Sequence, residues 1–226
     1  MYTISPRLKT IAGLVPKGDR VADIGTDHGY LPVFLVKNDI ASRVIACDIN
    51  EKPLLSARRN IEAAAVPRIE LRLCDGLAGI HKDEIDTAII AGMGGEVIAG
   101  ILSRCQWIKN SRYRLLLQPM TSAEELRKYL CREGFRINTE TAVADAGKIY
   151  TVIDAYFDGE KRQYPDSYMF IGELTNTYDA DIKYIKKQLK RIEKCRDDLK
   201  EVPAKQKEYL YYKQIADDIG AFLGGK

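Results

Sequence analysis

The sequence predicts an α/β protein: a Rossmann-like domain with a mostly parallel seven-stranded sheet, followed by an α-helical coiled hairpin. Two observations predict this fold. Between residues 7 and 157, short apolar stretches alternate with amphipathic ones, the order expected of parallel strands joined by helices. From residue 161, apolar residues recur every three or four positions, as they do along helices that pack together. We therefore expect two domains, residues 1–160 and residues 161–226.

The expected strands are short apolar runs that end at glycine or polar residues, and they cover residues 20–24, 43–48, 69–73, 86–91, 113–118, 137–144 and 150–157. We expect the last two to pair antiparallel. The expected helices cover residues 7–14, 31–37, 53–64 and 96–102, and a further one begins after Ser122 and ends at Gly134. Ser122 with Glu125 three residues later has the pattern of a capping box.

The C-terminal segment has a coiled-coil-like seam. Its apolar residues are Ile171, Leu174, Tyr178, Ile182, Ile185, Leu189, Ile192 and Leu199. Pro203 breaks this helix, and a second helix repeats the pattern with Tyr209, Tyr212, Ile215, Ile219 and Phe222. Because a two-helix seam can close on itself, we expect a monomer, although the same seam could pair with another chain.

Composition narrows the classes of protein. The net charge of +3 is small, and all of the excess lies in residues 161–226. We expect no membrane span and no signal peptide, because no run of about 18 apolar residues occurs and no basic segment precedes an apolar one at the N-terminus. Five scattered cysteines without a C-x-x-C pair indicate reduced thiols in a cytoplasmic protein, and two histidines predict no metal site.

The first expected strand runs into an acidic glycine turn, Val21-Ala-Asp-Ile-Gly-Thr-Asp-His-Gly-Tyr-Leu-Pro32. Dinucleotide-binding folds place a pyrophosphate over a G-x-G-x-x-G turn. Here only Gly25 and Gly29 are present, with Asp27 between them. A carboxylate at this position would repel a pyrophosphate but suits a ligand that carries positive charge and no phosphate. S-adenosylmethionine, with its sulfonium and ammonium groups, is such a ligand, so the turn predicts a class I methyltransferase rather than a dehydrogenase.

Acidic residues also follow the next strands, at the edge of the sheet where such folds bind ligands. Asp48 lies 23 residues after Gly25, where a carboxylate can accept hydrogen bonds from both ribose hydroxyls. Asp75 can accept the adenine amino group, and the backbone of Gly76 can pair with the ring. The alternative is that these aspartates are only caps or turn residues. The full cofactor-binding prediction is Asp23, Gly25, Asp27, His28, Asp48, Ile49, Asp75, Gly76, Ala91 and Gly92.

Three glycines stand where many amino-group methyltransferases have Asn/Asp-Pro-Pro-Tyr, in the sequence Gly92-Met93-Gly94-Gly95. They offer bare backbone facing a substrate, or they only allow tight strand-to-helix packing. His28 could act as a general base or could orient Asp27. We expect Asn60 to tie its helix to the turn, Gln118-Pro119-Met120 to wall the pocket, and Cys47 and Cys74 to be small core residues on buried strands.

Four segments together resemble the bacterial TrmK family over essentially the whole chain: Arg7-Leu8-x-x-Ile11-Ala12, the acidic turn, Asp86-x-x-Ile89-x-Ala91-Gly-Met-Gly-Gly95, and Leu117-Gln-Pro-Met120. The resemblance implies a tRNA adenine-N1 methyltransferase that uses S-adenosylmethionine and modifies adenosine 22, in the D-arm region. Asp27 and His28 are then the catalytic candidates, Asp27 by stabilising the positive charge that moves onto the base. Alternatives are another RNA base, a small molecule or protein substrate, and a non-enzymatic cofactor-binding module.

The predicted RNA contacts lie in two places. On the first hairpin helix, Lys183, Lys187, Lys190 and Lys194 are spaced to form one basic stripe, although such a stripe is often only a solvated helix face. Near the mouth of the expected site, Arg7 and Lys9 are further candidates. The predicted substrate-binding residues are Arg7, Lys9, Met93, Gly94, Gly95, Lys183, Lys187 and Lys190.

Overall fold

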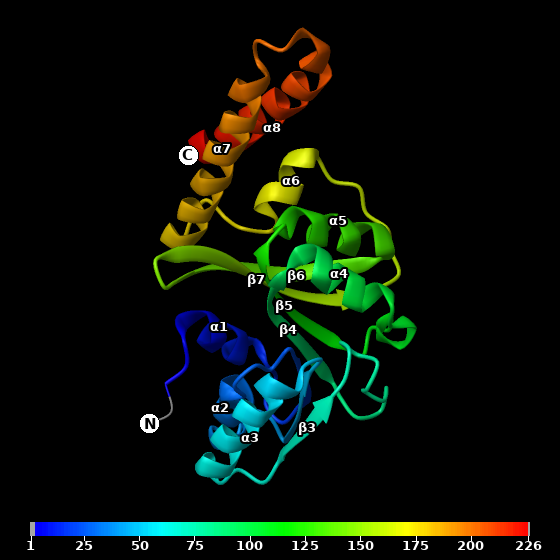
Figure 1. Ribbon diagram of the computed structural model, residues 1–226. Coiled ribbons are helices and arrows are strands. Elements are labelled where there is room, and N and C mark those ends of the chain that lie inside the picture. The colour runs from blue at the N-terminus through cyan, green and yellow to red at the C-terminus, as the bar shows by residue number, and fades with distance from the viewer. Residues whose placement is uncertain (1–2, 226) are drawn as a thin grey trace.

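The computed structural model describes residues 3–225 and contains a seven-stranded sheet with helices on both faces (Figure 1). The strands are β1 (Arg20–Ile24), β2 (Arg43–Asp48), β3 (Ile69–Leu73), β4 (Thr87–Gly94), β5 (Arg114–Thr121), β6 (Phe135–Asp145) and β7 (Lys148–Phe157). Their order is β3-β2-β1-β4-β5-β7-β6. The first five strands in this order are parallel, and β7 is antiparallel to both of its neighbours. The predicted Rossmann-like, mostly parallel sheet is confirmed.

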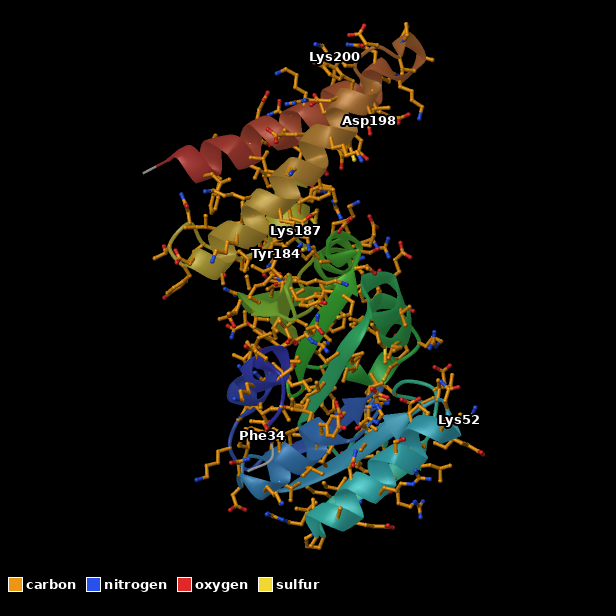
Figure 2. The ribbon with its side chains drawn as sticks, turned by 60° about the vertical axis from the view of Figure 1, so that its left-hand side comes forward. Phe34, Lys52, Tyr184, Lys187, Asp198 and Lys200 are labelled. Carbon is orange, nitrogen blue, oxygen red and sulfur yellow. The ribbon has the colours of Figure 1, made fainter. Side chains whose placement is uncertain are left out.

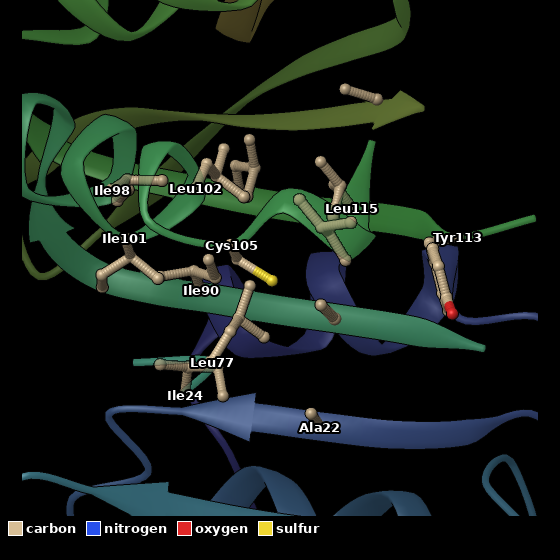
Figure 3. Packing of buried hydrophobic residues seen from close by; sticks show 14 of the residues in the cluster. Ala22, Ile24, Leu77, Ile90, Ile98, Ile101, Leu102, Cys105, Tyr113 and Leu115 are labelled. Carbon is tan, nitrogen blue, oxygen red and sulfur yellow. The ribbon is translucent and has the colours of Figure 1, made fainter. Parts of the chain in front are cut away.

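The two faces of the sheet carry separate hydrophobic layers. Alternate residues of a strand point to opposite faces, so Val21 packs with the helices of one face and Ala22 with those of the other. One face carries α1 (Pro6–Leu14), α2 (Tyr30–Lys37) and α3 (Glu51–Ala64), and the other carries α4 (Gly95–Ser103) and α5 (Ala123–Glu133). Figure 3 shows part of the second layer, where Ile24 and Ile90 of the sheet lie close to Leu77 and Ile98.

Two sequence predictions near β4 and β5 are wrong in detail. β4 does not end at Ala91: it continues through Gly94 beside β5, with register shifts at Met93 and Gly94. Ser122 does not form a capping box, because its side chain makes no cap hydrogen bond. An N-cap residue of that kind has extended backbone, whereas Ser122 is left-handed, with φ 51° and ψ 41°.

The C-terminal seam begins later than predicted. Ile171 ends a short separate helix, α6 (Asp166–Ile171). Gly172, with φ 62°, terminates this helix before α7 (Asp179–Leu199) starts. After a 3₁₀ turn at Pro203–Lys205, α8 (Gln206–Gly224) packs back along α7, and the pair extends away from the sheet (Figure 1). Apolar residues of both helices, Ile185, Ile192, Ile215 and Ile219, are buried in one shared cluster. The predicted helical hairpin is therefore present, but the boundary at residue 160 stays a prediction.

A buried ion pair joins the hairpin region to the sheet. Arg127 of α5 donates two hydrogen bonds to Glu140 of β6, at 3.2 and 2.5 Å, and a third to the Met169 carbonyl of α6, at 2.7 Å. Neither side chain of the pair is exposed. In the first turn of α7, Asp181 accepts hydrogen bonds from the backbone N–H groups of Ala142 and Thr175, each at 3.0 Å. These contacts fix α6 and the start of α7 against β6.

Within residues 3–225, no helix is both long enough and apolar enough to cross a membrane.

Candidate active site

Two neighbouring cavities open at the carboxyl ends of the central strands. The first, of about 640 Å³, lies over the ends of β1, β2 and β4, and we call it the main cavity. The second, of about 300 Å³, lies beside α1 and α2, and we call it the side cavity. Gly25, Asp27, Ala91 and Gly92 line both. The crevice follows from the topology, because the chain leaves β1 and β4 toward opposite faces of the sheet.

All of the predicted cofactor residues border one or both of these cavities. The main cavity is lined by Gly25, Asp27, Asp48, Ile49, Asp75, Gly76, Ala91 and Gly92, and also by Met93. Asp23 and His28 border the side cavity instead, together with Arg7. The structure therefore brings the whole predicted cofactor set to one edge of the sheet.

The glycine turn is shaped by close packing and an unusual backbone. Gly25 has φ 75°, a backbone conformation that strains a residue with a side chain, and a Cβ there would also displace the Met93 methyl group, which lies 2.2 Å away. The N–H groups of Gly25 and Thr26 both donate to the Cys47 carbonyl at 2.8 Å. Asp27 is left-handed with φ 52°, a conformation that costs energy in a residue with a side chain and tends to occur at functional sites. As predicted, the Asn60 side chain donates to the His28 carbonyl, at 2.8 Å.

The aspartates at the ends of β2 and β3 have local partners as well as cavity positions. Asp48 is buried, and its Oδ1 accepts the Asn50 N–H at 2.9 Å, which is the turn role considered as the alternative above. Asp75 is exposed and pairs with Arg104, the residue that follows α4, at 3.0 Å. The Arg104 side chain also lines the main cavity, so this ion pair forms part of its rim.

The two cysteines predicted to be core residues differ. Cys47 is fully buried on β2, as predicted. Cys74 is not on a buried strand: it follows β3, is only partly buried and lines the main cavity. The reason is that β3 is the edge strand of the sheet, so the residues after it are covered on one side only.

Asp23 is the most strongly perturbed carboxyl group at this edge. It is 4% exposed on β1, and burial raises its pKa to about 6, with a further contribution from the charge of Asp48. Burial disfavours the ionised form because the carboxylate loses its water. A cation bound at this edge would offset that cost, so the site suits a positively charged ligand.

Asp27 and His28 differ in position although they are adjacent in the chain. Their side chains are 68% and 48% exposed, and His28 Nε2 lies 3.5 Å from Asp27 Oδ2. Asp27 borders both cavities, whereas His28 borders only the side cavity and stacks on Tyr30 with ring centroids 5.4 Å apart. Asp27 is therefore the ionisable side chain placed between the two spaces.

Arg7 forms the wall of the side cavity opposite the glycine turn. Its Nη1 donates to the Gln118 side chain and lies 3.5 Å from the Met120 sulfur, and its Nε lies 3.5 Å from Asp145. Gln118 is fully buried, and the same Oε1 accepts the Gly92 N–H at 3.2 Å. Of the predicted wall Gln118-Pro119-Met120, only Met120 lines the side cavity; Gln118 lies behind the lining and holds Arg7 in place.

The remaining predicted substrate residues lie elsewhere. Among residues 3–225, neither cavity is lined by Lys9, Gly94 or Gly95. A Cβ at Gly95 would lie 2.1 Å from the Ser122 carbonyl oxygen, so this glycine serves strand-to-helix packing, the plainer of the two interpretations. The exposed lysines Lys183, Lys187 and Lys190 lie on α7, away from the main cavity; Figure 2 shows Lys187 on the part of α7 next to the sheet.

Several lining residues were not predicted. They include Asn50, Pro53, Glu96, Val97, Gly100, Ile101 and Arg104 at the main cavity, and Tyr30 at the side cavity. A signal for part of this set exists in the sequence. Val97, Gly100, Ile101 and Arg104 recur at spacings of three and four, so they share the face of α4 that begins at the predicted glycines.

The site has the composition of a small-molecule site without a metal. Its main cavity falls within the usual size range of ligand pockets, and its ionisable groups are chiefly carboxylates. Among residues 3–225, no three His, Cys, Asp or Glu side chains are arranged to hold a metal ion. The acids, the tight turn at Gly25 and the exposed apolar side chain of Ile49 fit S-adenosylmethionine, which carries positive charge, a ribose and an adenine.

Comparisons with known proteins agree with this geometry. A model of the methyltransferase domain family matches residues 4–153. The tRNA (adenine(22)-N(1))-methyltransferase of Bacillus subtilis is 40% identical over 164 residues, which cover 69% of this chain and 69% of that protein. The crystal structure of the B. subtilis m1A22 tRNA methyltransferase TrmK has a TM-score of 0.84 at 31% identity and covers 98% of each chain.

A second solved structure contains a cofactor product. M. capricolum TrmK in complex with S-adenosyl-homocysteine has a TM-score of 0.80 at 26% identity, and the match covers 98% of each chain. The similarity thus extends through the helical hairpin as well as the sheet. On this evidence, and as its four motifs predict, the chain belongs to the TrmK family of methyltransferases.

Proposed function

We propose that this protein transfers the methyl group of S-adenosylmethionine to N1 of adenosine 22 in bacterial tRNA. One observation carries the proposal: Gly25, Asp27, Ala91 and Gly92 form a wall common to the main cavity and the side cavity. A methyl donor in the main cavity and an acceptor base in the side cavity would meet at this wall. The B. subtilis relatives named for the m1A22 reaction support the choice of base and position.

Each chemical part of the cofactor has a residue suited to it. Asp48 would accept the ribose hydroxyls with the oxygen that its turn leaves available, and Asp75 with the backbone of Gly76 would recognise the adenine. Asp27, which borders both cavities, would lie at the methionine end, where the positive charges are, and Asp23 would face that end from the side-cavity side of the common wall. S-adenosylmethionine supplies an electrophilic methyl group when bound. The chain's own residues hold it and align the acceptor.

The reaction requires little acid–base chemistry from the protein. N1 of adenine has an unprotonated lone pair at neutral pH, so the residues of the site need to align it with the methyl group rather than remove a proton first. Transfer leaves a positive charge on the base. The Asp27 carboxylate lies at the common wall, and in our proposal it stabilises that charge or accepts a hydrogen bond from the exocyclic amine. We assign His28 to orienting Asp27, at 3.5 Å.

The RNA would approach from the side of α1 and the hairpin. N1 lies on the Watson–Crick edge, so a paired target must leave its helix to enter the side cavity. We propose that the D-arm region of the tRNA contacts Arg7 at the cavity and the exposed lysines of α7, Lys183, Lys187 and Lys190. We also propose that the enzyme acts as a monomer, because α7 and α8 bury their seam against each other. Its proposed location is the cytoplasm.

The reaction can be tested directly. The protein would be incubated with labelled S-adenosylmethionine and unmodified bacterial tRNA, and the RNA digested to nucleosides for mass spectrometry. We expect 1-methyladenosine, and its loss when adenosine 22 is replaced. Methylation that survives this replacement would overturn the position, and cofactor binding with no methylated nucleoside would direct the search to small molecules and proteins.

Variants of two aspartates should separate cofactor binding from transfer. We predict that Asp48→Ala raises the Kd for S-adenosylmethionine by about 10- to 100-fold, since it removes charge-assisted hydrogen bonds to the ribose. Asp27→Ala should instead lower kcat more than it raises that Kd. Calorimetry and single-turnover kinetics measure the two effects, and Asp198→Ala, on an exposed part of α7, is the control. Equal behaviour of the two variants would contradict the assignment.

Cofactor affinity should depend on pH through Asp23. Its pKa of about 6 means that the carboxyl group is ionised above pH 6 and neutral below it. The ionised form attracts the cationic cofactor, so we predict that the Kd rises as pH falls below 6, by up to about tenfold per unit. Asp23→Asn should bind weakly at every pH, while His28→Gln should keep the wild-type dependence. A pH dependence that persists in Asp23→Asn would assign it to another group.

The lysines of α7 should contribute to tRNA affinity through phosphate contacts. We predict that charge reversal of Lys183, Lys187 and Lys190 weakens tRNA binding and reduces the magnitude of the slope of log K against log salt by about 1 to 3. The reason is that tRNA binding releases about one counterion fewer for each phosphate contact that is lost. Reversal of Lys205, Lys207 and Lys213, which lie on the 3₁₀ turn and α8, is the matched control. Identical salt slopes for the two triple variants would mean that the α7 lysines form only a solvated helix face and do not contact the RNA.

A further inference from the structure

A third cavity lies between the hairpin and the sheet, and the reaction as described above does not use it. It has a volume of about 460 Å³ and lies between α7 and the carboxyl end of β5. We call it the hairpin cleft, and its lining includes Met120, Glu124, Tyr150, Lys187, Gln188 and Arg191. Figure 2 shows Tyr184 and Lys187 at this end of α7, with Asp198 and Lys200 at the far end.

The cleft is adjacent to the side cavity. Met120 lines both spaces. Arg7, which lines the side cavity, lies 3.5 Å from the Met120 sulfur, and its guanidinium carbon is 5.7 Å from the centre of the Tyr150 ring in the cleft. A chain that leaves the side cavity on this side therefore passes Arg7 and Met120 and enters the cleft. Arg7 is the cationic group at this partition, and Asp145 lies 3.5 Å from its Nε.

The lining has the groups that bind a single nucleotide. Tyr150 is a partly buried aromatic side chain on which a base can stack. Lys187 is exposed, and among residues 3–225 its side chain makes one hydrogen bond, of 3.3 Å to the Ile149 carbonyl, and no ion pair, so no carboxylate neutralises its charge. A phosphate is the ligand group that fits such a lysine.

Two further groups offer recognition of a base edge. Gln188 is 7% exposed, and its Oε1 is buried without a hydrogen-bond partner among the described residues. An unpaired buried acceptor of this kind is costly unless a ligand or water meets it. Glu124 pairs with Arg191 at 2.7 Å, so the cleft has one balanced ion pair in addition to the charge of Lys187. This combination suits a base with polar edges better than a bare anion.

We propose that the hairpin cleft binds the nucleotide next to the methylated one, with its base on Tyr150 and its phosphate at Lys187. The proposal rests on the proposed function, since it assigns a second subsite for the same RNA. It also gives the hairpin a specific role in recognition. Once the target leaves its helix, its neighbour is held in the cleft, and the RNA between them crosses Arg7 and Met120.

The test is a cycle between one protein change and one RNA change. Two tRNAs are prepared with an abasic nucleotide immediately before or immediately after the target, and their Kd values are measured by fluorescence anisotropy. For one of the two RNAs, wild-type protein should lose about tenfold in affinity, the range of one stacked base. Tyr150→Leu should lose a similar factor on intact tRNA and less than about twofold more on the abasic RNA. If the abasic change lowers the affinity of both proteins by the same factor, or lowers neither, the proposed nucleotide site in the cleft is wrong.

A lysine pair tests the phosphate contact independently of Tyr150. Lys187→Met should reduce the salt slope of tRNA binding by about one. Lys186→Met removes the same charge from the neighbouring exposed position, which does not line the cleft, and should leave the slope unchanged. If both variants change the slope equally, the charge of α7 acts diffusely and the phosphate site is wrong. Calorimetric Kd values for S-adenosylmethionine that match wild type show that each variant is folded.

The failure of this proposal differs from that of the proposed function. The cleft is tested through tRNA affinity, whereas the reaction is tested through the methylated nucleoside formed by wild-type protein. If the wild-type protein methylates a nucleotide other than adenosine 22, the proposed position is wrong. The cleft is then tested by repeating the same affinity measurements with abasic changes next to that nucleotide. If neither abasic change alters the Kd for tRNA and 1-methyladenosine still forms normally, the proposed nucleotide site in the cleft is wrong while the proposed function stands.

Discussion

The parallel pairing of β1 with β4 is the constraint on which the rest of the site depends. These strands are adjacent in space but separated by two other strands in the chain, and they pair in register from Val21–Thr87 to Ile24–Ile90. Because both strands are buried, neither can shift without moving apolar side chains out of the core. The chain then leaves their carboxyl ends in different directions, and the crevice between the two exits is the main cavity. Gly25 stands directly after β1 and Gly92 lies in the last part of β4, and both line the main cavity and the side cavity, so neither adds a side chain to the wall between them.

Charge is distributed to suit two different ligands. Asp23, Asp27, Asp48 and Asp75 gather where a cationic cofactor would bind, and the ionised form of the buried Asp23 gains stability when a cation is near. The cations for a polyanionic substrate lie outside this ring: Arg7 at the side cavity and the exposed lysines of α7 beyond it. The small net charge of the chain conceals this separation, because Lys and Arg elsewhere in residues 1–160 balance the acids of the sheet edge, and residues 161–226 carry an excess of only +3. A protein of this composition can therefore attract RNA locally without being basic overall.

The sequence was most informative where function depends on local order. Asp48 and Asp75 could be identified because a carboxylate directly after a strand reaches the ligand edge in any parallel sheet. The alternation of apolar runs likewise predicted all seven strands and their mixed directions. Arg7 illustrates what remained hidden: its partners Gln118, Met120 and Asp145 come from β5 and the β6 end, and no spacing rule links them to α1. The seam was misjudged at Ile171 because its apolar spacing continues across Gly172, where only the backbone conformation reveals the break. The predicted capping box at Ser122 was wrong for the same reason, since a sequence pattern of capping residues does not determine the φ of the first residue.

The hairpin can act on the RNA only if its position relative to the sheet is fixed, and the buried pair of Arg127 and Glu140 contributes to this through the Met169 carbonyl of α6, which precedes the hairpin. A fully buried ion pair adds little net stability when intact, but removal of one partner leaves an uncompensated charge and is strongly unfavourable. It therefore selects one arrangement over others rather than strengthening all of them. Arg127 also holds the Met169 carbonyl of α6, and Asp181 holds the first turn of α7 against β6. With both ends of the connection fixed in this way, Lys187 and Gln188 are kept at a constant position relative to Tyr150 and Met120. The cleft between hairpin and sheet is thus as much a product of the sheet's polar anchors as of the hairpin's own apolar seam.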